Sequence, residues 1–202
     1  MMRNLWRCAA ALAAVFLLAG MAGRAAEVRA HPAYLAGFAD GTLRPDAPLT
    51  REQLAQILYR LLPREILPDA PRAAAYVDVA ANRWSYRAVC ALTQLGVWED
   101  ARQPHFDPQR QVTGAEFAET LRRAGAYLPA LAAAEADAPD RPVTRAQAAR
   151  TLNALLGRTG ETMPAGLLHF CDVTADRADY ADLCEASNPH CVMPDGTWDA
   201  VG

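Results

Sequence analysis

A short phrase that recurs three times constrains the fold of this chain more than any other feature. Each copy has an aliphatic residue, then a threonine, then a glutamate or glutamine three positions after the threonine. The copies occupy residues 49–53, 112–116 and 143–147. Such a threonine caps a helix while the Glu or Gln side chain bonds back to it, an arrangement called a capping box. The sequence therefore predicts three helices that begin in the same way.

Apolar residues follow each capping threonine at the spacing of one helix face. They are Leu54, Ile57, Leu58 and Leu61 in the first copy, Phe117, Leu121 and Ala124 in the second, and Ala148, Leu152 and Leu155 in the third. This spacing predicts three amphipathic helices that bury one face each.

A second pattern recurs at an offset of 94 residues, with YVDV at 76–79 and FCDV at 170–173. An aspartate precedes a helical stretch in both copies, so Asp78 and Asp172 are expected to cap a helix or a turn. The two patterns alternate along the chain as helix, loop and helix. This alternation is typical of repeat proteins, whose units cannot bury their apolar faces alone.

The repeats are incomplete, and their limits divide the chain into segments. We expect a signal peptide at 1–25, the second half of a first repeat at 31–62, a second repeat at 76–124, a linker at 125–141, the second half of a third repeat at 142–157, and a terminal repeat-like segment at 170–202. The stretch 128–131 is compatible with the start of a short helix, but Ala, Asp and Pro dominate its segment and favour a linker.

The N-terminus has the pattern of a secretory signal peptide. Arg3 and Arg7 precede an uncharged run of 16 residues at 8–23, and small residues follow it. A helix needs roughly 20 apolar residues to span a bilayer, so a retained anchor is the weaker alternative. We therefore expect a secreted protein that has no membrane contact once the signal peptide is removed.

The charge of the processed chain argues against a nucleic-acid partner. Removal of residues 1–25 takes away three arginines and no acid, which changes the formal net charge from −3 to −6. A protein this acidic is a poor general ligand for phosphate backbones or anionic lipids.

Four stretches of the chain resemble the S-layer homology (SLH) family. They are YVDV at 76–79, WSY at 84–86, GFADGTLRP at 37–45 and LTREQLA at 49–55, and residues 180–190 are similar to the end segment of such proteins. The resemblance covers roughly residues 32–200. It implies an all-α fold of three degenerate helix-loop-helix repeats around a central helical bundle, in a pseudo-threefold arrangement.

The same resemblance implies a function without catalysis or a cofactor. Proteins of this family attach non-covalently to the cell wall, and the grooves between their repeats hold acidic, often pyruvylated polysaccharide. The arginine of the repeated phrase is the family's ligand-binding residue, which implicates Arg51 and Arg145. The residues expected to complete the site are Thr50, Thr144, Gln53, Gln147, Glu116 and Trp84.

Physical reasoning gives these arginines two interpretations. Arg51 and Arg145 take the first helical position, where the helix dipole disfavours a cation by roughly 0.3–1 kcal/mol. The cap does not need them, and a guanidinium beside a helix N-terminus suits a carboxylate ligand. The alternative is a solvated surface arginine, or one paired with a nearby aspartate.

Other residues weaken the expected site. Gly114 replaces arginine in the second phrase, so that groove should lack its cation, and Gln53 and Gln147 replace glutamate. Trp84 suits stacking on a sugar ring, although a buried core position is the favoured interpretation.

The processed chain keeps four cysteines, for which export permits disulfides. Disulfides are expected among Cys90, Cys171, Cys184 and Cys191, with a local C-terminal pairing favoured and thiols as the alternative. The neighbouring His169 and His190 do not complete a paired zinc-ligand spacing, so no metal site is expected.

Two further functions remain open. The degenerate repeats are compatible with a structural or protein-interaction module at the cell surface that has lost its glycan site. A small secreted hydrolase is the less favoured alternative, since paired carboxylates form only in space and sequence spacing does not reveal them. The chain has no nucleophile motif or phosphate-binding loop, which favours a protein that is not an enzyme.

Overall fold

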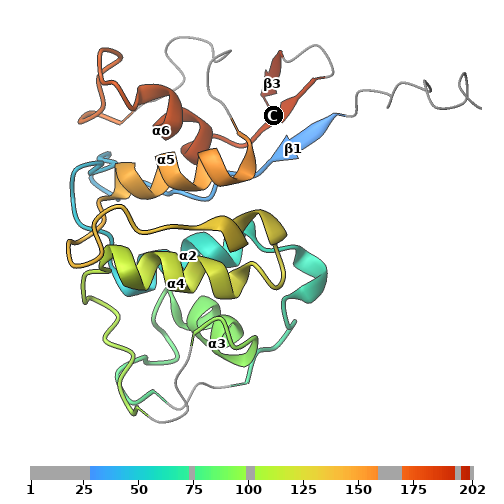
Figure 1. Cartoon of the computed structure of the whole chain (residues 1–202), viewed down its shortest axis with the longest axis vertical. Coiled ribbons are helices and arrows are strands. Elements are labelled where there is room, and N and C mark those ends of the chain that lie inside the picture. Colours follow the sequence, from blue (N-terminus) through green and yellow to red (C-terminus); the bar gives the residue numbers. More distant parts are fainter. Residues whose placement is uncertain (1–27, 73–75, 99–102, 159–169, 194–196, 201–202) are drawn as a thin grey trace, which may run out of the picture.

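The computed structural model describes residues 28–72, 76–98, 103–158, 170–193 and 197–200 (Figure 1). The predicted signal peptide at 1–25 lies outside these residues. Among the helices that are described, none has the length and apolar character needed to cross a membrane.

Helices dominate the described residues, and a small sheet accompanies them. The α-helices are α2 (Arg51–Leu61), α3 (Tyr86–Gln94), α4 (Gly114–Ala124), α5 (Arg145–Leu156) and α6 (Tyr180–Ser187), and the short 3-10 helices are η1 (Arg64–Ile66) and η2 (Pro129–Ala133). The strands β1 (Arg29–His31), β2 (His190–Val192) and β3 (Trp198–Ala200) form an antiparallel sheet in the order β1-β2-β3. The all-α prediction did not include this sheet.

The repeated threonines begin α2, α4 and α5 as predicted, with one variation among the caps. At Thr144 both halves of the capping box form, at 3.2 Å to the hydroxyl and 2.8 Å to the Gln147 side chain. At Thr50 the Gln53 side chain accepts the backbone N–H at 3.1 Å. Thr113 caps its helix through its hydroxyl at 3.3 Å, but the Glu116 side chain turns away to another partner.

Each capped helix packs against an element that comes later in the chain. α2 packs on α3, α4 on η2, and α5 on α6. Figure 1 shows α6 above α5, and α3 below α2 and α4. η2 belongs to the segment 125–141, which the sequence predicted mainly as a linker. Leu131 of η2 is fully buried, because this segment covers the face of α4 that has no longer helix to pack against.

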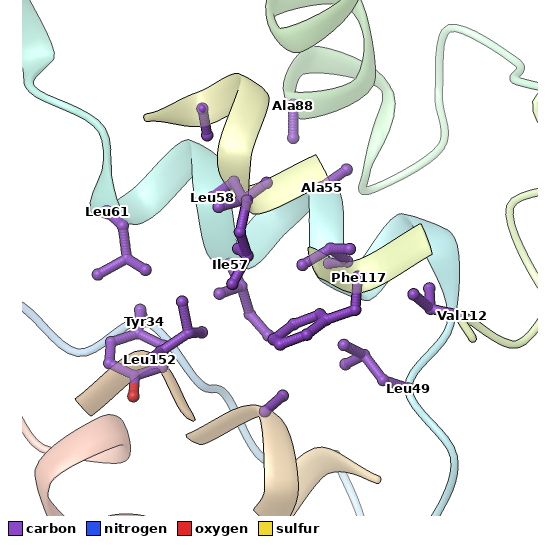
Figure 2. Packing of buried hydrophobic residues seen from close by; sticks show 14 of the residues in the cluster. Tyr34, Leu49, Ala55, Ile57, Leu58, Leu61, Ala88, Val112, Phe117 and Leu152 are labelled. Carbon is purple, nitrogen blue, oxygen red and sulfur yellow. The ribbon is translucent and has the colours of Figure 1, made fainter. Parts of the chain in front are cut away.

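Backbone hydrogen bonds connect the three helix starts in a ring. The Leu49 N–H donates to the Val143 carbonyl at 2.8 Å, the Val143 N–H to the Val112 carbonyl at 2.9 Å, and the Val112 N–H to the Leu49 carbonyl at 2.9 Å. Leu49 and Val112 are fully buried and lie beside Phe117 in the core (Figure 2). Burial of each such side chain contributes about 1.5–3 kcal/mol, so these contacts help to hold the helix starts together.

The two predicted aspartate caps perform the same structural task. Asp78 accepts the backbone N–H groups of Phe106 and Asp107, both at 2.8 Å. Asp172 accepts those of Leu43 and Arg44, at 2.8 and 2.7 Å. In each pair, the second N–H donor belongs to a residue with positive φ, which is 53° at Asp107 and 54° at Arg44. The carboxylates therefore brace strained turns, and Asp172 connects the C-terminal segment to the first half-repeat.

Candidate ligand-binding groove

An open groove of about 720 Å³ lies along α2 and the segment that precedes it. Its lining comes from residues 34–39, from α2, from the loops that carry Trp84 and Gln109, and from Arg145 at the start of α5. The groove therefore collects residues from five separate parts of the chain.

Arg145 is a buried cation without a carboxylate partner among the described residues. Its Nε donates to the Leu43 carbonyl at 2.9 Å and its Nη2 to the Ala36 carbonyl at 2.6 Å. The guanidinium carbon lies 5.0 Å from the centre of the Phe38 ring. Burial lowers the pKa of Arg145 to about 10, so the side chain remains charged at neutral pH. The hydrogen-bond partners of this charge are carbonyl oxygens, while the more distant charge of Asp172 raises its pKa.

Arg51 has different surroundings, although it takes the same helical position. Its Nη1 forms an ion pair with Glu116, and Arg110 contacts the same carboxylate oxygen at 2.7 Å. Its guanidinium carbon lies 4.8 Å from the centre of the Phe106 ring. Burial lowers the pKa of Arg51 while the Glu116 charge raises it. Arg51 is therefore a neutralised cation that does not line the groove.

A buried carboxylate holds the loop that presents Trp84. Glu52 is 1% exposed, accepts from Arg83 Nε at 2.7 Å, and accepts from the Ser85 hydroxyl at 2.7 Å. The side chain of Gln109 donates to the same carboxylate. Because Arg83 and Ser85 flank Trp84, this network fixes the backbone on both sides of the indole.

Trp84 itself is 58% exposed and lines the groove. The favoured interpretation of a buried core tryptophan is therefore wrong. The helix face of α3 that packs inward begins at Ala88 and Val89, which are 1% exposed. Trp84 precedes this helix, so the core has no position for it.

Of the predicted site residues, the structure brings Gln53, Trp84 and Arg145 together in the groove. The other predicted site residues lie outside the groove lining, namely Thr50, Arg51, Glu116, Thr144 and Gln147. Thr50 and Thr144 act as caps, and Gln147 is exposed on α5.

Sequence reasoning missed Gln56 and Arg60, which extend the groove along α2. With Gln53 they sit at positions i, i+3 and i+7, so they form one polar stripe on the helix. Arg60 is exposed and adds a second cation to the groove. The stripe was visible as helical spacing, but nothing in the sequence showed that it faced a groove.

Gly114 replaces the arginine of the second phrase for a steric reason. A Cβ at this position would collide with the carbonyl oxygen of Ala138 and lie 2.9 Å from its carbonyl carbon. The Gly114 N–H donates to the Arg141 carbonyl at 2.9 Å, which holds the two backbones together. The segment 125–141 therefore occupies the place where a side chain would project.

The cysteines do not form the expected C-terminal pairing. No disulfide joins Cys90, Cys171, Cys184 or Cys191, all of which lie in described segments. Cys184 is buried in α6, whereas Cys171 is exposed on the preceding loop. The alternative of thiols agrees with the structure.

Comparison with known proteins places part of this chain in a family. Residues 34–55 and 75–118 match the family profile described as S-layer homology domain. These residues include the groove wall at 34–39, the start of α2 and Trp84.

Two curated relatives are surface proteins. Cell surface glycoprotein 1 of Acetivibrio thermocellus is 35% identical over 88 residues, which cover 44% of this chain and 4% of that protein. Surface-layer 125 kDa protein of Lysinibacillus sphaericus is 28% identical over 104 residues, which cover 52% of this chain and 8% of that protein. The matches thus span less than a tenth of each relative. The repeated motifs, the family profile and the two surface-protein relatives thus agree that this part of the chain is similar to the S-layer homology domain.

Proposed function

We propose that this chain attaches non-covalently to acidic cell-wall polysaccharide through the groove along α2, and that it acts without catalysis. S-layer homology domains bind cell-wall polysaccharide in S-layer and surface proteins. The observation that carries the proposal here is Arg145, a buried cation that faces the groove and has no carboxylate partner among the described residues.

The groove offers complementary contacts for an anionic sugar. Arg145 and Arg60 supply positive charge, and a guanidinium suits a carboxylate such as that of a pyruvyl group. The exposed face of Trp84 offers an apolar platform for a sugar ring. Gln53 and Gln56 add amide donors and acceptors between these two contacts.

The acids near the groove argue against hydrolysis. Glu52 is the carboxylate among the described lining residues, and it is already bonded to Arg83, Ser85 and Gln109. Glycoside cleavage in most families needs a pair of carboxyl groups about 5–9.5 Å apart across the sugar bond. The groove favours binding over hydrolysis because Glu52 is held by these partners and the other charged lining residues, Arg60 and Arg145, are cations.

The proposal extends to architecture and location. The ring of bonds among Leu49, Val112 and Val143 supports a pseudo-threefold arrangement of three degenerate repeats. A secreted chain held at the cell wall would expose its groove to wall polymers. The relatives, which are named as surface proteins, support this location.

A sedimentation assay with isolated cell-wall sacculi tests the binding. The chain without residues 1–25 is mixed with sacculi before and after acid removal of their polysaccharide, and the bound fraction is measured. We expect retention only on untreated sacculi, with soluble acidic polysaccharide as a competitor. Equal retention on both preparations would contradict the proposal.

Groove variants then test the site. Trp84→Ala and Arg60→Ala change exposed side chains, so the fold should persist and the affinity should fall at least tenfold in the double variant. Arg64→Ala is the matched control, because Arg64 is an exposed arginine of η1 outside the groove. If the control weakens retention as much as the double variant, the groove is not the binding site.

A further inference from the structure

Three side chains with metal-binding groups meet on one face of the small sheet. β1 and β2 pair with His31 opposite His190, and opposite residues of an antiparallel pair project to the same face. Glu185 of α6 reaches this face, with Oε1 at 2.9 Å from His31 Nδ1 and Oε2 at 3.2 Å from His190 Nε2. One ligand atom from each residue lies within 4.8 Å of the others.

The surroundings of His190 determine which ring nitrogen carries the proton. Nδ1 lies 2.9 Å from the Asn188 carbonyl oxygen, which can only accept, so Nδ1 is the donor. In a neutral ring Nε2 then presents a lone pair, and it faces Glu185 Oε2. Both atoms are buried, and their 3.2 Å approach lacks the alignment of a hydrogen bond. Two electron-pair donors face each other here, an arrangement that a shared cation makes favourable.

We propose that His31, Glu185 and His190 bind a transition-metal ion, with Zn²⁺ as the best match. Two imidazole nitrogens and one carboxylate oxygen form a common zinc ligand set, with bonds of about 2.0–2.2 Å. Tetrahedral bonds of that length place ligand atoms about 3.3 Å apart. The 3.2 Å between His190 Nε2 and Glu185 Oε2 lies near this value, and the 2.9 Å between His31 Nδ1 and Glu185 Oε1 is shorter because these two atoms form a hydrogen bond.

The neighbourhood supports ligation in two further ways. Metal-bound histidines usually donate their other N–H to a carbonyl or carboxylate, as His190 does toward Asn188. The Trp198 ring stacks on His190 with 3.3 Å between ring centres, which fixes the ring orientation. A bound ion would tie β1 to β2 and α6.

Zinc titration of the full chain tests this site. The protein is stripped with a chelator, kept reduced, and titrated with Zn²⁺ in a calorimeter. We expect one ion per chain, and at least 100-fold weaker binding for Glu185→Gln. The amide of this variant has the same volume and can donate to His190 Nε2, so circular dichroism should show an intact fold. His105→Ala is the control, because this histidine is exposed and lies outside the cluster.

Two other results would overturn the inference. One is wild-type zinc affinity in both Glu185→Gln and His31→Ala, and the other is an absence of zinc binding by the wild type. A Cys171→Ser/Cys191→Ser variant excludes thiolates as the ligands, and its affinity should equal that of the wild type. Loss of binding in this cysteine variant alone would assign the ion to sulfur ligands and contradict the proposed set.

Discussion

Arg51 and Arg145 take the same place in their repeats, yet only Arg51 is neutralised. Arg51 pairs with Glu116, the third helical residue of α4, whereas Arg145 bonds to carbonyl oxygens. The Arg51 N–H donates to the loop before α4, and the Arg145 N–H donates to the loop before α2. Each arginine therefore neighbours the start of another capped helix, whose third residue is Glu116 for Arg51 and Gln53 for Arg145. Gln53 has no charge with which to neutralise Arg145.

This comparison shows that an arginine at the same helical position can have different roles in different repeats. The position of each arginine follows from its own helix, because the phrase sets where α2 and α5 begin. Whether that arginine is paired with a carboxylate depends on the third helical residue of a neighbouring repeat. We therefore expect the exchange of glutamate for glutamine at this position to leave Arg145 available while Arg51 is paired.

The test with the largest expected effect restores an arginine at the first position of α4, where the chain has Gly114. Gly114→Arg should destabilise the protein by about 3 kcal/mol, because the new side chain would displace the backbone at Ala138. Chemical denaturation measures this loss. Ala115→Arg is the control, since Ala115 is exposed in the same helical turn and should change stability by less than about 0.5 kcal/mol. A stable Gly114→Arg protein would mean that the 125–141 segment moves aside easily.

The second test removes the charge that neutralises Arg51. Glu116→Gln should cost about 1–2 kcal/mol of unfolding free energy, because Arg51 and Arg110 lose their shared carboxylate. The variant should also leave Arg51 without a carboxylate partner, as Arg145 is, and so increase retention of the protein on sacculi. Glu119→Gln on the exposed side of α4 provides the comparison, with a smaller change in stability and none in retention.

The reverse exchange should weaken binding. Gln53→Glu places a carboxylate in the groove that holds Arg145, which should lower affinity for acidic polysaccharide about tenfold, or about 1.4 kcal/mol. The capping box survives because glutamate also serves at this position. Competition with soluble polysaccharide measures the change, and unchanged affinity would show that Arg145 does not contact the ligand.

The variants with the smallest expected effect distinguish the capping role of Gln53 from its role in binding. Gln53→Ala and Gln147→Ala each remove one half of a capping box, so both should lose about 0.5 kcal/mol of stability. Only Gln53 lines the groove, so only its variant should also reduce retention. Thermal unfolding and sedimentation on the same samples compare the two quantities. Equal retention by both variants would limit Gln53 to its cap.

Local chemistry explains what could be predicted from the sequence. The three helix starts and the tasks of Asp78 and Asp172 depend on residues close in the chain, so spacing revealed them. The pairing of Arg51 with Glu116 joins residues 65 positions apart, and no local pattern indicates it.

Three further features required the folded chain. Gly114 looked like a lost site, whereas the structure shows that the backbone of Ala138 leaves no room for a side chain. His31 and His190 lie beside each other only because β1 pairs with β2. Trp84 showed no sequence signal that distinguishes an exposed aromatic from a core one.

The bonds between Asp172 and the amides of Leu43 and Arg44 have a consequence for the order of folding. They join residues 129 and 128 positions apart, so the first half-repeat cannot complete its turn until the C-terminal segment has been synthesised. Contacts of such long range slow folding because a large loop must close first. The second repeat makes its equivalent contact over 28 residues. We therefore expect the middle of the chain to fold early, and the repeat shared between its two distant segments to close last.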